Sequence, residues 1–238
     1  MTAKVDARVP LTRERVMDAA VALADRSGIE ALTMRNLAHE LGVEAMSLYY
    51  HVANKEAILD GITEVVVGEI NEAVAASESA SVSGDWKRAL RKRILTAREV
   101  LLRHPWASSL IATRTSISLE TMRYFEGVLA TFKTGGFSYD LAHHAMHVLG
   151  SRALGFTQEL FEPDDQDAAE DDTADMLALM ADQFPHLVGM MMEIAHDDPE
   201  STLGWCDDQT EFVFGLDLIL DGLDRLVSAP VGYPADRP

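Results

Sequence analysis

The feature that most constrains the fold is a tight corner at Gly42 between two helix-sized stretches. The stretch LTMRNLAHEL, residues 32–41, places Leu37 and Leu41 one turn apart on one face. The stretch EAMSLYYH, residues 44–51, follows the corner almost at once and is short and polar. Two helices joined by a glycine-containing turn of three or four residues are typical of a helix-turn-helix. In that motif the second helix enters the major groove of DNA while the first crosses the backbone.

The rest of the chain shows helical periodicity and none of the alternation typical of strands. Thr12 and Gly28 are placed to begin and end a first helix, and Thr33 is placed to cap the next. Asn54 is placed to cap a helix that runs to about residue 75. The polar stretch 76–84 predicts a boundary, and the acidic stretch 162–175 predicts a solvated loop. Further helices are expected at 86–103, 118–134, 138–160, 176–195 with an interruption near Pro185, and 207–226. The fold class that follows is all-α.

The charge is unevenly distributed along the chain. The formal net charge is −19, yet residues 1–60 hold seven Lys and Arg against nine Asp and Glu. The strongly acidic remainder of the chain cannot bind DNA broadly. Residues 1–60, which form a nearly neutral head, can bind DNA through a few well-placed cations. We therefore expect a modest dependence of DNA binding on salt.

The side chains around the Gly42 corner suit contact with DNA. Arg35 can reach a guanine edge or a phosphate, and Ala45 and Met46 can contact thymine methyl groups. In the second helix the side chains of Ser47, Tyr49, Tyr50 and His51 can donate hydrogen bonds to phosphates. Lys55 lies at a helix start, where backbone N–H groups also favour an anion. A tyrosine or histidine on a helix is more often a packed or capping residue, but all of them together on this helix favour DNA. The predicted contact residues are Thr33, Arg35, Glu44, Ala45, Met46, Ser47, Tyr49, Tyr50, His51 and Lys55.

The stretch from Leu32 to Leu59 resembles the DNA-binding head of the tetracycline-repressor (TetR) family. The resemblance covers roughly residues 11–62, and Leu48-Tyr49, His51 and Asn54-Lys55 are its most specific positions. It implies an all-α homodimer whose two helix-turn-helix heads bind successive major grooves of a pseudo-palindromic operator. The domains expected are a three-helix head at 1–62, linked by a helix to about residue 75, and a larger ligand-binding and dimerisation domain at 63–238.

The resemblance continues into the second domain, in the helices expected at about 138–160 and 207–226. They look like the two long helices through which such proteins dimerise as a four-helix bundle, and each is too apolar on one stripe to be left in water. The alternative is that these stripes belong to the core of the subunit itself.

The family's second domain usually encloses a small molecule that changes the spacing of the two heads. In tetracycline repressors a histidine ligates the magnesium that the drug carries, and alignment places Leu110 there, which cannot ligate magnesium. Drug-contacting positions become Asn71 and Arg93, while Glu159 keeps a carboxylate. Recognition of tetracycline by the same chemistry is therefore not expected. Candidate apolar lining residues are Trp106, Leu110, Thr113, Met122, Phe125, Met146, Leu154, Phe156 and Met176. Candidate polar anchors are Arg93, His147, Arg152, Gln158 and Glu159.

Other classes of function have weaker support. His143 and His147 lie one turn apart, a spacing that can bind a transition metal, but no third ligand is evident and polar surface histidines are the favoured interpretation. We predict no metal and no cofactor. Catalytic motifs do not stand out, and the single cysteine, Cys206, lies beside an acidic run that disfavours a thiolate.

The sequence therefore predicts a cytoplasmic transcriptional regulator that is not an enzyme. The opening decapeptide lacks the apolar region of a secretory signal. Repression is the expected mode, with release of the operator by a small-molecule effector, although promoter position decides between repression and activation. The alternative is a small-molecule-binding or protein-interaction module that no longer binds DNA.

Overall fold

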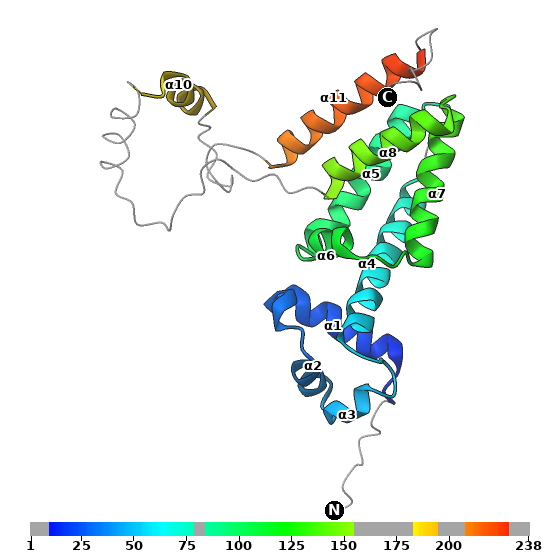
Figure 1. Ribbon diagram of the computed structural model, residues 1–238, viewed down its shortest axis with the longest axis vertical. Helices are drawn as coiled ribbons and strands as arrows, with labels where there is room; N and C mark the ends of the chain where they lie inside the picture. The colour runs from blue at the N-terminus through cyan, green and yellow to red at the C-terminus, as the bar shows by residue number, and fades with distance from the viewer. Residues whose placement is uncertain (1–9, 79–83, 155–182, 195–207, 229–238) are drawn as a thin grey trace, which may run out of the picture. The chain divides into compact units, whose positions relative to one another are not determined.

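The computed structural model describes residues 10–78, 84–154, 183–194 and 208–228, and all regular secondary structure in these ranges is helical (Figure 1). This confirms the all-α prediction. The helices are α1 (Arg13–Ser27), the short 3₁₀-helix η1 (Ile29–Ala31), α2 (Met34–Leu41), α3 (Ala45–Leu48), α4 (Lys55–Glu78), α5 (Trp86–Arg103), α6 (Ala107–Thr113), α7 (Leu119–Thr134), α8 (Tyr139–Leu154), α10 (Pro185–Ile194) and α11 (Asp208–Ser228).

The chain divides into two compact units. The first contains α1 to α8 and the end of α11 from Leu223, and the second contains α10 and α11 as far as Gly222. Helix α10 begins at Pro185, because a proline at the first helical position loses no hydrogen bond, and the part of the expected helix at 176–182 lies outside the described residues. The predicted acidic loop at 162–175 lies outside the described residues.

The predicted helix starts in the head are confirmed by their capping bonds. The hydroxyl of Thr12 accepts from the backbone N–H of Arg15 at 3.2 Å, and that of Thr33 accepts from Asn36 at 3.1 Å. Asn54 Oδ1 accepts from the backbone N–H of Ala57 at 2.9 Å. Each bond satisfies one of the N–H groups that a helix start leaves without an internal partner.

The second helix of the helix-turn-helix is shorter than predicted. A helix was expected over 44–51, whereas α3 ends at Leu48 and residues 49–51 form a turn. The backbone N–H of His51 donates to the carbonyl of Leu48 at 2.9 Å, a three-residue step that tightens and closes the helix. Rings in succession have low helix propensity, and helix α4 begins at Lys55, only four residues after His51.

The core of the head continues into the larger domain. Leu37, Leu48 and Ile58 share one buried cluster with Trp106 and Leu110, which lie just before and within α6. Helix α4 contacts α1, α5, α6 and α7, so it is common to both regions (Figure 1). Helix α6 has no counterpart among the predicted helices, and its residues Ala107 and Leu110 belong to the core that the two regions share.

Candidate nucleic-acid interface, effector cavity and junction

Helix α3 and the turn after it divide sharply into a buried side and an exposed side. Leu48 is fully buried, with 0% of its surface exposed, and anchors the segment. Around it Tyr50 is 89% exposed, Met46 71% and Tyr49 47%. Large rings and a thioether are seldom left in water without a partner in such a short stretch. The head therefore presents a set of amphipathic side chains on a well-anchored support.

The other predicted contact residues border this surface. Arg35, Glu44 and Lys55 are exposed, while Ala45, Ser47 and His51 are half-buried. Thr33 is exposed as a residue, and its hydroxyl already caps α2. All ten predicted residues thus lie in the segment from the N-cap of α2 to the start of α4, within the helices or in the turns beside them.

Two basic side chains beside this surface were missed by sequence reasoning. Arg15 and His39 border an open groove that also involves Glu44 and Ser47. Arg15 donates to the carbonyl of Pro10 at 2.6 Å, which holds its guanidinium near the start of α1. For Arg15 the available signal was its place in the first turn of α1, because an arginine there suits phosphate contacts.

An apolar cavity lies within the larger domain, between α5, α7 and α8. Two predicted ligand residues, Phe125 of α7 and Met146 of α8, line it. The remaining lining residues are Leu90, Ile94, Tyr124, Val128, Leu149, Gly150 and Ala153. Convergent apolar walls of this kind are typical of small-molecule sites, but the cavity volume of about 60 Å³ is well below the roughly 300–1,000 Å³ of such sites.

A buried cation lies close to the apolar cavity. Arg93 of α5 is buried, and its guanidinium lies 5.7 Å from the ring centroid of Tyr124, a lining residue. Helix α7 approaches this group at Gly127, where a Cβ would overlap the guanidinium. Arg93 was predicted as a polar anchor, and the structure places it beside the cavity rather than among the residues that line it.

The other predicted ligand residues are dispersed. Trp106 and Leu110 lie in the core shared with the head, and the hydroxyl of Thr113 donates to the carbonyl of Leu110 at 2.9 Å. Met122 and His147 are exposed, and Arg152 and Leu154 are partly buried. Phe156, Gln158, Glu159 and Met176 lie outside the described residues.

Leu110 and Asn71 occupy the positions that align with the magnesium-ligating histidine and with a drug-contacting residue of the tetracycline repressors. Leu110 is buried among apolar neighbours and offers no oxygen or nitrogen ligand. Asn71 Nδ2 donates to the backbone carbonyl of Glu120 at 2.9 Å and to its carboxylate at 2.8 Å. These residues do not fit a magnesium-chelated drug bound in the manner of the tetracycline repressors.

The three histidines of α8 lie on its exposed side. The ring centroids of His143 and His147 are 4.6 Å apart, and those of His143 and His144 are 5.8 Å apart. Asp140 Oδ1 is 3.8 Å from His144 Nε2. Among the described residues no group of three or more His, Cys, Asp or Glu side chains is arranged to hold a metal ion.

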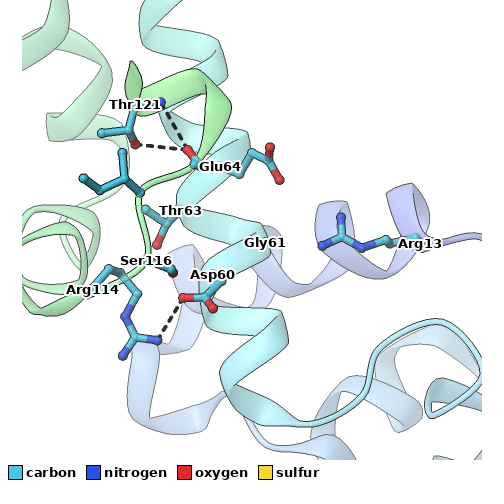
Figure 2. A pocket seen from close by; sticks show the side chains of 10 residues that line it. Arg13, Asp60, Gly61, Thr63, Glu64, Arg114, Ser116 and Thr121 are labelled. Carbon is cyan, nitrogen blue, oxygen red and sulfur yellow. Dashed lines mark hydrogen bonds and ion pairs between the residues drawn. The ribbon is translucent and has the colours of Figure 1, made fainter. Parts of the chain in front are cut away.

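A second, polar cavity lies at the junction of the head and the larger domain. It is bordered by α1, by α4 and by the segment that joins α6 to α7, and Figure 2 shows Arg114 turned toward Asp60 across it. The lining residues are Arg13, Asp60, Gly61, Thr63, Glu64, Arg114, Ser116, Ile117, Ser118 and Thr121. Several of its polar groups are already bonded within the protein: Thr63 to the carbonyl of Leu59, and Ser118 to Thr121. These groups have less capacity left for a ligand, although the volume of this cavity, about 200 Å³, exceeds the 60 Å³ of the apolar cavity.

Arg114 ties the segment between α6 and α7 to the start of α4. Its Nη1 donates to Glu56 Oε2 at 2.8 Å and to Asp60 Oδ1 at 3.2 Å. The hydrogen bond with Glu56 is the main cause that raises the pKa of Arg114, and burial opposes it. Arg114 therefore remains charged at any physiological pH.

No helix among the described residues is both long enough and apolar enough to cross a membrane. This is consistent with the absence of a long uninterrupted apolar run from the sequence.

Comparison with known families matches both regions. Residues 16–62 match the model described as bacterial regulatory proteins of the tetR family, and residues 79–227 match the tetracyclin repressor-like C-terminal domain. An HTH-type transcriptional regulator of Saccharopolyspora erythraea is 36% identical over 127 residues, which cover 53% of this chain and about half, 51%, of that protein. The HTH-type transcriptional repressor DrrR1 of Streptomyces coeruleorubidus is 30% identical over 94% of this chain and 82% of its own length.

A solved structure agrees with these relatives. The Streptomyces coelicolor TetR family protein ActR, in complex with actinorhodin, has a TM-score of 0.66 and 25% identity, and the match covers 91% of this chain and 97% of that chain. The exposed helix-turn-helix surface, the helical larger domain and both family matches lead to one conclusion. The chain belongs to the tetR family of bacterial regulatory proteins, and it is a ligand-responsive transcriptional repressor that binds DNA as a dimer.

Proposed function

We propose that the ten head residues predicted from the sequence form the operator contacts, with Arg35, Met46 and Tyr49 at their centre. The observation that carries this is the contrast within α3 between fully buried Leu48 and its exposed neighbours. An anchored helix with exposed polar tips can enter a major groove without deforming the head. Arg15 and His39 extend the surface with two further groups suited to phosphates.

We propose a head at 1–62, continued by a helix to about residue 75, and a ligand-binding and dimerisation domain at 63–238. We also propose that the regions 138–160 and 207–226 form the dimer interface. In α8, Val148 is exposed, and in α11 Phe214 and Leu218 are exposed one turn apart. The buried stripe of α11, at Phe212, Leu216 and Leu220, lies on a different side of that helix, so a second apolar stripe remains for a partner.

The dimer interface has a direct test. Phe214→Glu together with Leu218→Glu should turn the dimer into a monomer at micromolar concentration, because two charges would be buried without partners. Asp217→Ala in the same helix is the matched control. Sedimentation velocity distinguishes the two, and an unchanged dimer in the charged variant would contradict this interface.

We propose an effector that is mostly apolar and built of aromatic rings, on the chemistry of the cavity walls rather than on the cavity volume of about 60 Å³. The cavity between α5, α7 and α8 has aromatic and aliphatic walls, with Arg93 nearby to meet an acidic or carbonyl group. The solved complex of ActR with actinorhodin supports a multi-ring effector by analogy. A ligand that prefers a different separation of the two heads would release the operator by shifting the population of conformations.

We further propose that the protein acts in the cytoplasm and catalyses no reaction, since its role as a regulator needs only binding. Its target is a pseudo-palindromic operator whose half-sites lie one DNA turn apart, about 34–36 Å. Repression follows if the operator overlaps a promoter.

The experiment that tests the function is an in vitro selection of bound genomic fragments. Native protein should enrich a pseudo-palindromic site, whereas the Arg35→Ala/Tyr49→Ala variant should not. The genes beside the site would then suggest effectors to test. Failure of the native protein, both alone and with cell extract added, would favour the alternative of a binding module that has abandoned DNA.

A further inference from the structure

The α5–α6 corner places a buried imidazole between the head and the larger domain. His104 follows α5, and its side chain is almost entirely buried. Its Nδ1 lies 2.8 Å from Asp25 Oδ1, on α1, and its Nε2 lies 3.3 Å from Glu69 Oε2, on α4. Arg103 Nη2 also reaches that oxygen of Glu69, at 3.4 Å. One ring therefore connects three helices.

A second donor from the same corner reaches the same carboxylate. Trp106 Nε1 donates to Asp25 Oδ1 at 2.7 Å, and the rings of Trp106 and His104 meet edge to face with centroids 5.9 Å apart. Asp25 lies in the last turns of α1 and is partly exposed, yet both of its donors are buried. Charge-assisted hydrogen bonds from buried donors fix geometry better than exposed ion pairs do.

Because of its position, this cluster can restrain the orientation of the head. Helix α1 contacts α2 and α4, so a restraint on the end of α1 restrains the whole head. The larger domains hold the two subunits together in the proposed dimer, and the angle between each head and its own larger domain then sets the distance between the two recognition helices. That distance must match the half-site spacing of the operator.

We propose that Asp25, His104 and Trp106 form a clasp that fixes the angle of the head and thereby sets the half-site spacing that the dimer accepts. All three act as positioning residues, since they lie outside the proposed DNA contacts. The inference rests on the proposed function, because spacing has meaning only for a dimer that binds two half-sites.

The test measures binding to a set of operators rather than to one. The selected half-site is placed in duplexes whose spacer is shortened or lengthened by about one to three base pairs around the native length. Native protein should prefer its own spacing by about tenfold or more over these alternatives. Asp25→Asn, His104→Gln and Trp106→Phe should each reduce that preference to about threefold or less, while discrimination between correct and mutated half-sites stays unchanged.

Arg26→Ala is the matched control. Arg26 follows Asp25 in α1, but its ion pair, at 2.9 Å, is with Glu40 inside the head itself. This variant should keep the native spacing preference even where its affinity falls. A general loss of stability would weaken binding at every spacing equally, so it cannot imitate a flattened preference.

The outcomes separate the two proposals. Folded, dimeric clasp variants that keep the native spacing preference would overturn the clasp and leave the repressor function intact. Should a variant fail to fold, the conservative Trp106→Phe substitution, which removes one donor and keeps a ring, decides the matter alone. Absence of DNA binding by the native protein and by Arg26→Ala would overturn the DNA contacts themselves and the clasp with them.

Discussion

The proposed DNA-contact surface of the head and the proposed effector cavity of the larger domain are built in opposite ways. The head assembles its surface from residues close in sequence, and most of its exposed groups are polar or amphipathic. The cavity draws on three helices that span residues 90 to 153, and its walls are almost wholly apolar. A surface that reads DNA must match a fixed repeating partner, whereas a cavity needs only shape and a few polar groups. The head can therefore be recognised by its motif and the cavity only by its geometry.

The largest expected effect separates the two surfaces. Arg35→Ala combined with Tyr49→Ala should weaken operator binding about a thousandfold, because each subunit loses two contacts worth about 1 kcal/mol or more. Fluorescence anisotropy with a labelled operator measures this loss, and binding of an apolar dye to the larger domain should not change. Tyr139→Ala removes a tyrosine of α8 that is even more exposed, at 70% against 47% for Tyr49, and should leave DNA binding intact. A parallel loss of dye binding would mean that the two surfaces are not independent.

The second largest effect is expected at Leu48, the buried residue that anchors α3 beneath the exposed surface of the head. Leu48→Ala should lower the free energy of unfolding by about 3 kcal/mol, because it opens a cavity in a fully buried position. Met46→Ala, two residues earlier and well exposed, should change it by less than about 0.5 kcal/mol. Urea denaturation followed by circular dichroism measures both. Equal effects of the two substitutions would contradict the division of α3 into a buried and an exposed side.

Substitutions in the cavity should reduce ligand affinity less than the head substitutions reduce operator affinity. Phe125→Ala or Met146→Ala should each reduce the affinity for anilinonaphthalene sulfonate about tenfold, as expected when a large apolar side chain is lost from a binding wall. Met122→Ala is the matched control, since Met122 lies one turn before Phe125 on α7 and does not line the cavity. A drop with Met122→Ala and none with Phe125→Ala would place the site elsewhere.

The sequence predicted features that depend on neighbouring residues better than features that depend on residues far apart in the chain. The predicted caps depend on short-range contacts, because each side-chain oxygen accepts from the backbone N–H three residues later. The local sequence pattern was therefore enough to identify Thr12, Thr33 and Asn54 as caps. The early end of α3 was missed because helical periodicity does not mark where a turn takes over. Trp106 was assigned to the ligand from its residue type, whereas its indole N–H bonds to Asp25, 81 residues away. Residue type predicts burial, but the identity of the neighbour depends on tertiary packing, which a single sequence does not show.

The smallest expected effect concerns the ion pairs that join the two regions at the polar junction. Arg114→Ala should lower the free energy of unfolding by only about 0.5 kcal/mol, since Glu56 and Asp60 are well exposed and water screens them. The pKa of Arg114 is raised in the folded state, so its contribution is complete below the ordinary arginine range and is lost only above it.

The difference between native protein and Arg114→Ala should therefore be constant from about pH 6 to about pH 9 and should shrink in concentrated salt. Arg123→Ala, which removes an exposed pair with Glu120 within α7, should have no measurable effect. A difference that varied with pH in this range, yet resisted salt, would show that Arg114 holds the two regions together through packing or a titrating neighbour. The head and the larger domain would then be coupled at this junction by more than surface charge.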